Sequence, residues 1–230
     1  MCFIKKLKII LAYFYILNKS VLETFNMTIV TIDGNIGAGK STLLEYIQRN
    51  TDYLIDVEPV HDWEPFLTDM YQKNKDAFEF QVKVWIDRSY TPHYPTNKVT
   101  CVERSPHFQW NVFSKANYEN HKLNDRQIEL IGELYKKPCY LPDICIYLKT
   151  DPEKCMERIH HRHRSCENAI PLSYVTNIHR LHEEAYETLH HPYKVEIDIE
   201  NKSVEQIGRE VISTILILLK KRRSVDLERI

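Results

Sequence analysis

Residues 28–42 read TIVTIDGNIGAGKST, a short apolar stretch that runs into a glycine-rich segment. Gly34, Gly39, Lys40 and Ser41 fit the pattern G-x-x-x-x-G-K-[ST] at each of its fixed positions. The β-branched residues before the glycines predict a strand, and the apolar spacing of TLLEYIQR after them predicts a helix. In this setting a turn rich in glycine can wrap a polyphosphate and direct backbone N–H groups at its oxygens. The segment therefore predicts a loop that binds a nucleoside triphosphate.

The sequence of this loop also predicts that a metal ion binds beside it. Its lysine reaches the terminal phosphates, and the hydroxyl that follows the lysine is a ligand for Mg²⁺. We assign binding of the nucleotide to the whole loop, which consists of Gly34, Asn35, Ile36, Gly37, Ala38, Gly39, Lys40, Ser41 and Thr42.

Composition limits the kind of protein. With 230 residues, of which 43% are hydrophobic, the chain suits one well-buried α/β domain. A net charge of −1 and a pI near 6.8 give no overall attraction to nucleic acid or to an anionic membrane, so we expect a small-molecule substrate and neither of those partners. The six cysteines form no C-x-x-C pair, which favours reduced thiols and a cytoplasmic location.

Residues 1–26 precede the domain that contains the loop. Three lysines, Lys5, Lys6 and Lys8, are followed by an apolar run over 9–17 that is about half the length needed to span a bilayer. The segment has the outline of a presequence but no small-residue cleavage site, and it is not rich in arginine or serine. We expect residues 27–230 to form the domain and residues 1–26 to be a dispensable extension or to lie upstream of the true start. A mitochondrial location is expected only if this extension acts as a presequence.

Strand and helix patterns alternate along the rest of the chain, with no internal repeat. Such alternation predicts an α/β fold in which a mostly parallel, five-stranded sheet is covered by helices on both faces. After the first strand and helix, strands are expected over 53–57, 98–102, 143–148 and 193–198. Helices are expected over 65–87, 106–115, 125–136, 172–189 and 204–219, and a further helix is expected to begin at residue 152.

Charged side chains follow two of the predicted strands. Glu58 comes after the strand at 53–57, and Glu103 and Arg104 end the strand at 98–102. Open α/β sheets bind their ligands at the carboxyl ends of the strands. Three further arginines, Arg158, Arg162 and Arg164, form a local cationic cluster. In a chain without overall positive charge, such a cluster favours a clamp on transferring phosphates over a solvated helix face.

Gln81 lies in the helix expected over 65–87 and Arg88 follows its end; the two residues are seven apart and should project from one face. By itself, such a pair is typical of a solvated helix surface.

Several segments, taken in order, resemble the deoxyribonucleoside kinase family, which includes deoxycytidine, deoxyguanosine and mitochondrial thymidine kinases and an insect enzyme of broad specificity. The resemblance implies a three-layer P-loop kinase fold, transfer of the γ-phosphoryl group of ATP to the 5′-hydroxyl of a deoxyribonucleoside, a role in nucleotide salvage, and a homodimer. It covers nearly everything from residue 27 onward and is carried by GNIGAGKST (34–42), EPV followed by tryptophan (58–63), FQ (80–81), ERS (103–105), PDICIYL (142–148), PEKCMERI (152–159) and RHRSCENAIPLSYV (162–175).

The resemblance also implies roles for the charged residues. Glu58 is expected to be the base near the 5′-hydroxyl, and Glu103 is expected to hold Mg²⁺ together with Ser41. The reverse assignment, in which Glu103 accepts the proton, stays open. Arg104 would tether the 5′ oxygen, while Arg158, Arg162 and Arg164 would close over the phosphates of ATP as a lid.

For the nucleoside, the resemblance implies a pocket with Gln81 at the base edge. Trp63, Phe80 and Phe113 would form its apolar walls, and Tyr71 and Glu167 would contact the sugar 3′-hydroxyl. A tyrosine packed under the sugar leaves no room for a 2′-hydroxyl, which favours deoxyribose.

The chain departs from the family near the base and in the lid. Arg88 stands where deoxycytidine and deoxyguanosine kinases also carry arginine, but their partner aspartate is replaced by Gln109. We therefore expect an arginine at the base that has lost its usual carboxylate, and the base preference stays open. His163 stands where the lid often has glycine.

Two other functions are compatible with parts of this sequence. A thymidylate-type nucleotide kinase shares the loop and the arginine lid but should carry Asp-Arg after the third strand, where this chain has Glu103-Arg104-Ser105. A kinase-like subunit kept only as a structural part of a larger assembly has no reason to retain every phosphate and magnesium group.

Overall fold

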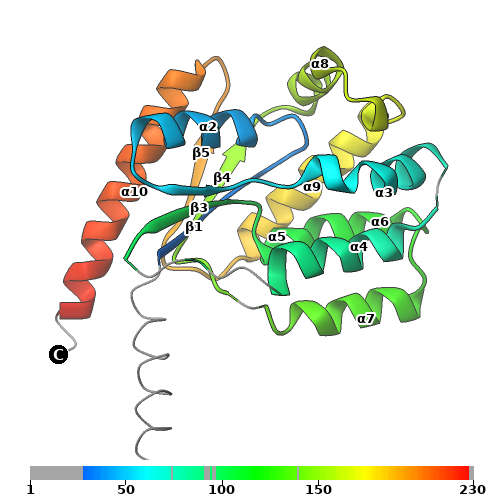
Figure 1. The fold of residues 1–230 in the computed structure, drawn as a ribbon, viewed down its shortest axis with the longest axis horizontal. Helices are drawn as coiled ribbons and strands as arrows, with labels where there is room; N and C mark the ends of the chain where they lie inside the picture. The colour runs from blue at the N-terminus through cyan, green and yellow to red at the C-terminus, as the bar shows by residue number, and fades with distance from the viewer. Residues whose placement is uncertain (1–27, 74, 91–93, 95–96, 139, 228–230) are drawn as a thin grey trace, which may run out of the picture.

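A five-stranded parallel sheet forms the centre of the molecule (Figure 1). The computed structural model describes residues 28–73, 75–90, 94, 97–138 and 140–227, so the predictions for residues 1–26 lie outside the described residues. The strand order is β2-β3-β1-β4-β5, which confirms the expected α/β architecture. The strands are β1 (Thr28–Gly34), β2 (Leu54–Asp56), β3 (Val99–Glu103), β4 (Ile144–Lys149) and β5 (Lys194–Asp198).

Helices cover both faces of this sheet (Figure 1). One face packs against α2 (Lys40–Asn50) and α10 (Val204–Leu227). The other face packs against α9 (Leu172–Thr188) and a continuous helical stretch made of α5 (Pro106–Phe108), the π-helical η2 (Gln109–Ser114) and α6 (Lys115–Glu119). The remaining helices are α3 (Val60–Gln72), α4 (Ala77–Trp85), the π-helical η1 (Ile86–Tyr90), α7 (Asp125–Tyr135), α8 (Pro152–Arg162) and the 3₁₀ turn η3 (Ser165–Glu167).

Strand β1 is buried on both faces, as a central parallel strand must be. Val30 and Ile32 point into the core beneath α2 and α10, where they meet Leu44 and Val211. Asp33 follows Ile32 in the strand, so its side chain points to the opposite face of the sheet, where it is also fully buried. Because β1 lies between β3 and β4, the chain leaves it at the point where the strand order reverses. This is where open α/β sheets form their ligand crevice.

The single helix expected over 65–87 was wrong. The structure contains two helices there, because α3 ends at Gln72 and the chain turns through Asp76, whose φ of 58° lies in the left-handed region, before α4 begins. Helix α3 also begins earlier than expected and carries Pro65 within it. The break matters for function, since it lets α3 and α4 form separate walls of the site described below.

No helix among the described residues is both long enough and apolar enough to cross a lipid bilayer.

The contact between α2 and α10 depends on a residue without a side chain. A Cβ atom placed on Gly208 of α10 would lie 2.1 Å from Cδ1 and 3.0 Å from Cγ of the Tyr46 ring on α2. We expect Gly208→Ala to lower the free energy of unfolding by about 1–3 kcal/mol, because the ring or the helix must move. Urea denaturation measures this loss. Adding Tyr46→Leu to the variant should recover part of it, and a Gly208→Ala protein as stable as the wild type would contradict the prediction.

Candidate active site

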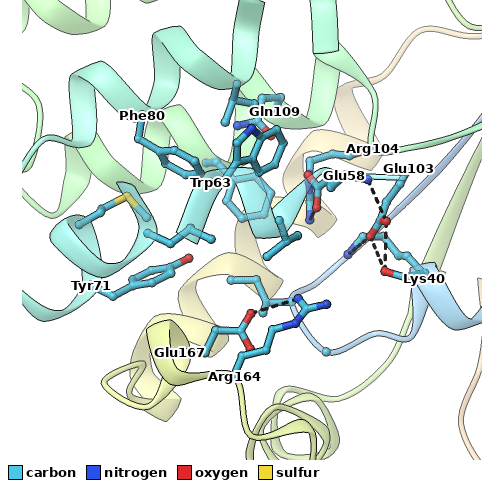
Figure 2. A pocket seen from close by; sticks show the side chains of 18 of the residues that line it. Lys40, Glu58, Trp63, Tyr71, Phe80, Glu103, Arg104, Gln109, Arg164 and Glu167 are labelled. Carbon is cyan, nitrogen blue, oxygen red and sulfur yellow. Dashed lines mark hydrogen bonds and ion pairs between the residues drawn. The ribbon is translucent and has the colours of Figure 1, made fainter. Parts of the chain in front are cut away.

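A cavity of about 440 Å³ opens at the carboxyl ends of the strands, beside the glycine-rich loop. Figure 2 shows Trp63, Phe80 and Gln109 on one side of it and Lys40 with Glu103 on the other. The cavity thus joins the phosphate loop to the aromatic residues that the sequence assigned to the nucleoside. Of the predicted residues, its lining includes Ile36, Gly37, Gly39, Lys40, Ser41, Thr42, Glu58, Trp63, Tyr71, Phe80, Gln81, Glu103, Arg104, Gln109, Phe113, Arg162, Arg164 and Glu167.

The loop conformation requires glycine at one position in particular. Gly37 has a φ of 81°, and a Cβ atom there would lie 2.4 Å from the carbonyl oxygen of Cys155 in α8. Gly39, also left-handed, precedes the first residue of α2. The Lys40 ammonium is almost fully buried and donates to the carbonyl oxygens of Gly34 (3.1 Å) and Asn35 (3.0 Å). The amine is thereby folded back over the loop that would hold the phosphates.

Ser41 and Glu103 meet as the sequence predicted for a metal site. The Ser41 hydroxyl lies 3.1 Å from each carboxylate oxygen of Glu103, and the Lys40 ammonium lies 3.9 Å from one of them. Hydroxyl and carboxylate oxygens are the hard ligands that Mg²⁺ takes alongside water and substrate phosphates. The donor set therefore fits Mg²⁺, and its assignment to these two residues stays a prediction.

Glu58 is held by Arg104. The Arg104 Nε donates to Glu58 Oε1 (2.7 Å), its Nη1 donates to the Gly34 carbonyl (3.3 Å), and its guanidinium lies 4.1 Å above the Phe113 ring. Burial opposes ionisation of Glu58, but the charges of Arg104 and Lys40 outweigh it and lower the pKa of the carboxyl group. Glu58 is therefore ionised at neutral pH.

Aromatic side chains from three elements line the apolar end of the cavity. Trp63 of α3 and Phe80 of α4 meet edge to face with ring centroids 5.7 Å apart, and the Trp63 indole donates to Asp87 (2.8 Å). Tyr71 meets Tyr174 of α9 in the same manner at 5.8 Å. Burial, followed by the neighbouring Tyr174, raises the pKa of the Tyr71 hydroxyl, which stays protonated and can donate a hydrogen bond.

Gln81 is a buried cavity residue, as the resemblance implied, and does not lie on a solvated helix surface. Its Oε1 accepts a hydrogen bond from the Ser114 hydroxyl (2.8 Å), which fixes the carboxamide. Sequence reasoning gave no role to several residues of the same wall, because nothing in their side-chain chemistry or spacing marked them as site residues. These residues are Val60, Leu67, Met70, Val84, Asn117 and Tyr174.

The arginine lid is ion-paired across the cavity mouth. Arg162 donates twice to Glu167, from Nε (2.6 Å) and from Nη2 (2.7 Å), and Arg164 lies 3.5 Å from the same carboxylate. In Figure 2, Glu167 and Arg164 lie together below the phosphate loop. His163 between the two arginines has a φ of 53°, which explains the preference for glycine at this position of the lid.

Arg158 does not line the main cavity. It lies instead at a second cavity of about 150 Å³, behind the phosphate loop. The second cavity is lined by loop residues, by the segment that follows β5 and by the start of α10, including Gly39, Thr42, Ile199, Lys202 and Val204. The two cavities share Gly39 and Thr42 in their linings, whereas Lys40 and Ser41 line only the main cavity.

Comparison with known families identifies the architecture. The profile described as Deoxynucleoside kinase matches residues 30–220, which is most of the chain. The chain belongs to the deoxynucleoside kinase family. The resemblance inferred from the motifs is thus confirmed, and with it a nucleoside kinase that takes its phosphate from ATP and serves nucleotide salvage.

Individual relatives of this chain are also named as kinases. A putative kinase protein of Invertebrate iridescent virus 6 is 31% identical over 82% of this chain and 97% of that protein. A probable deoxycytidine kinase of Fowlpox virus is 31% identical over 78% of this chain and 80% of its own length. Mitochondrial thymidine kinase 2 of Homo sapiens is 29% identical over 70% of this chain and 65% of its own length. The two rival functions find no support in these relatives.

Arg88 of the kinase does not line the cavity, and with Gln109 in place of the usual aspartate it pairs instead with another carboxylate. Its guanidinium pairs with Asp56 at the end of β2 and donates to the Glu103 carbonyl (3.0 Å). Arg88 lies in the π turn η1, which holds more residues than an α turn, so it no longer projects in the direction of Gln81. Its role in reading the base stays a prediction.

We expect Arg88→Met to lower the free energy of unfolding of the kinase by about 1–3 kcal/mol, because Asp56 and the Glu103 carbonyl both lose a donor. Urea denaturation measures the change. Arg180→Met is the matched control, since Arg180 makes only exposed ion pairs, which contribute little. Activity of Arg88→Met with thymidine and with deoxycytidine tests base reading in the same protein, where a shift toward thymidine is the result that base reading predicts.

Proposed function

We propose that the kinase phosphorylates the 5′-hydroxyl of a deoxyribonucleoside in the main cavity, with Glu58 as the base and Ser41 and Glu103 as the Mg²⁺ ligands. The observation that carries this proposal is the position of Arg104. Its guanidinium joins the Glu58 carboxylate to the Gly34 carbonyl of the phosphate loop, so the acceptor and donor sites share one side chain.

The reaction forms a bond from the nucleoside O5′ to the γ-phosphorus and breaks the bond between that phosphorus and the oxygen that bridges it to ADP. The proton of the 5′-hydroxyl passes to the ionised Glu58 carboxylate, and the electron pair of the broken bond stays on ADP. Lys40 and Arg104 neutralise charge on the transferring group. Bound Mg²⁺ would supply further neutralisation of the phosphate oxygens.

Glu103 is less suited to be the base. Both of its carboxylate oxygens already accept from the Ser41 hydroxyl, and one of them also lies 3.3 Å from the backbone amide of Glu58. These contacts direct Glu103 toward the phosphate loop, whereas the Glu58 carboxylate lines the nucleoside side of the cavity with Arg104. The geometry therefore favours Glu58 over the reverse assignment.

The second cavity supplies a place for the base of ATP. Its walls combine apolar side chains such as Leu43, Ile199 and Val204 with the cationic Arg158 and Lys202. A guanidinium can stack on a flat heteroaromatic ring while apolar groups cover its other face. We accordingly assign Arg158 to the base end of ATP and Arg162 and Arg164 to its phosphates.

For the acceptor, we assign the base to the wall formed by Gln81, Gln109 and the Trp63, Phe80 and Phe113 rings. Tyr71 and Glu167 would bind the sugar 3′-hydroxyl. The two lid arginines already pair with Glu167, so binding of phosphates by these arginines would release its carboxylate toward the sugar.

A homodimer is proposed from the apolar side chains left exposed on neighbouring elements. Leu130 of α7 is 56% exposed and Ile86 of η1 is 43% exposed, and α4 packs against both of these elements. Light scattering on the purified protein should give twice the mass of the chain, and Leu130→Glu should convert it to a monomer. A monomeric wild-type protein would contradict this proposal.

The proposed reaction is tested with radiolabelled ATP and the four common deoxynucleosides, each beside its 5′-monophosphate. The expected product is a nucleoside monophosphate that forms only when Mg²⁺ is present, with ribonucleosides used less well than deoxyribonucleosides. Phosphate transfer to the monophosphates in place of the nucleosides would overturn the proposal.

A further inference from the structure

Arg104 sits in a backbone conformation that is costly for a residue with a side chain. Its φ is 68°, in the left-handed region, at the point where β3 ends and the chain turns into α5. Non-glycine residues persist in this region when the surrounding structure holds them there, and such positions gather at functional sites. Here the turn directs the guanidinium at Glu58 and the phosphate loop. Some contact must therefore hold the turn in place.

Three hydrogen bonds fasten this turn to β1. The Arg104 amide donates to the Ile32 carbonyl (3.0 Å), and the next amide, that of Ser105, donates to the Asp33 carboxylate (2.8 Å). The Ser105 hydroxyl also donates to Asp33 Oδ1 (3.2 Å) and accepts from the Phe108 amide (3.2 Å) as the N-cap of α5. Asp33 therefore receives both donor groups of the residue that follows Arg104.

The buried carboxylate of Asp33 lowers the stability of the folded protein. Its side chain is fully buried, and burial raises the pKa of the carboxyl group to about 6, although the Ser105 amide and the Arg104 charge partly offset the effect. A carboxyl group whose pKa is raised by folding lowers the stability of the folded state once the pH exceeds the pKa that the group has in the unfolded chain. For Asp33 the full loss of stability is present above a pH of about 6. A buried charge retained at such a cost at neutral pH indicates a role beyond folding.

We propose that Asp33 is a positioning residue for phosphoryl transfer, which holds Arg104 in its left-handed turn by accepting both hydrogen bonds of Ser105. This inference rests on the role proposed above for Arg104. Asp33 touches neither substrate, and it acts only through the turn.

The test compares two substitutions of Asp33 by steady-state kinetics. Asp33→Ala removes the acceptor and should lower kcat by about tenfold to a hundredfold, with a smaller change in the KM for the nucleoside, since small displacements of catalytic groups cost that much. Asp33→Asn keeps an acceptor for Ser105 and should restore kcat to within about threefold of the wild type. Asp33→Val, which fills more of the space, replaces Asp33→Ala if that variant does not fold.

A double-mutant cycle shows whether Asp33 acts through Arg104. In an Arg104→Ala background, Asp33→Ala should change kcat by less than about threefold, because the group being positioned is absent. Equal losses of kcat with and without Arg104 would overturn the inference, as would a normal kcat for both Asp33→Ala and Asp33→Val. A normal kcat for Arg104→Ala alone would instead overturn the proposed role of Arg104.

The chain offers a matched control at the other end of β1. Asp143 accepts a hydrogen bond from the Ile29 amide (2.7 Å) and pairs with Arg222, far from the cavity. Asp143→Ala should lower stability and leave kcat unchanged. A loss of kcat in Asp143→Ala as large as that in Asp33→Ala would overturn the inference, because kcat would then be reporting stability.

Discussion

Lys40→Ala should lower kcat by at least about 10²–10³-fold, because the variant loses the positive charge that neutralises the transferring phosphate. The ammonium is buried at the loop, within 3.1 Å of the Gly34 carbonyl and 3.9 Å of Glu103, so no solvent cation can readily take its place. Transfer of labelled phosphate from ATP to a deoxynucleoside measures the loss.

Lys194→Ala is the matched control for Lys40→Ala. Lys194 begins β5 and donates to the Tyr186 carbonyl (2.8 Å), at the opposite end of the sheet from the cavity. Its removal should leave kcat within about threefold of the wild type, as is usual for substitutions away from a site. A Lys40→Ala enzyme as active as the Lys194→Ala enzyme would contradict the role of Lys40.

Because Lys40 is buried, we also expect the binding of ATP to depend on pH. Burial, together with the Arg104 charge, lowers the pKa of Lys40 to about 8 in the protein without nucleotide, against the pull of Glu103 and Glu58. Lys40 is charged below this value and neutral above it. The affinity for ATP should therefore fall as the pH rises through about 8, and calorimetric titration of Lys40→Ala should not show this fall. Equal pH profiles for both proteins would contradict the prediction.

Glu58→Gln should lower kcat by about 10²–10⁴-fold and change the KM for the nucleoside much less, because a general base contributes in the transition state. The glutamine retains an oxygen that can accept from Arg104, so the fold of the site is preserved while proton acceptance is lost. Steady-state kinetics with varied nucleoside separates the two effects.

Glu103→Gln serves as the comparison for Glu58→Gln. Because Glu103 faces Ser41, its substitution should raise the Mg²⁺ concentration needed for half-maximal activity, and Glu58→Gln should not. Unchanged turnover in Glu58→Gln, combined with a large loss in Glu103→Gln at saturating Mg²⁺, would assign the base to Glu103.

Short-range patterns predicted most of the architecture. The alternation of apolar strands and amphipathic helices predicted the five-stranded parallel sheet, because each strand buries its own side chains whatever its partner. The pattern failed between α3 and α4, where the start of α4 depends on a left-handed Asp76 that no glycine or proline marks. It also failed at Arg88, since the π turn that rotates this side chain leaves no trace in apolar spacing.

The phosphate loop and the family could be recognised without the structure, because Gly34, Lys40 and Ser41 lie within one continuous segment whose backbone chemistry is local. Which charged groups meet became known from the folded chain alone. Arg104 reaches Glu58 across 46 residues, Arg88 reaches Asp56 across 32, and Ser105 reaches Asp33 across 72. Strand order brings these partners together at one edge of the sheet, and spacing along the chain carries no information about that order.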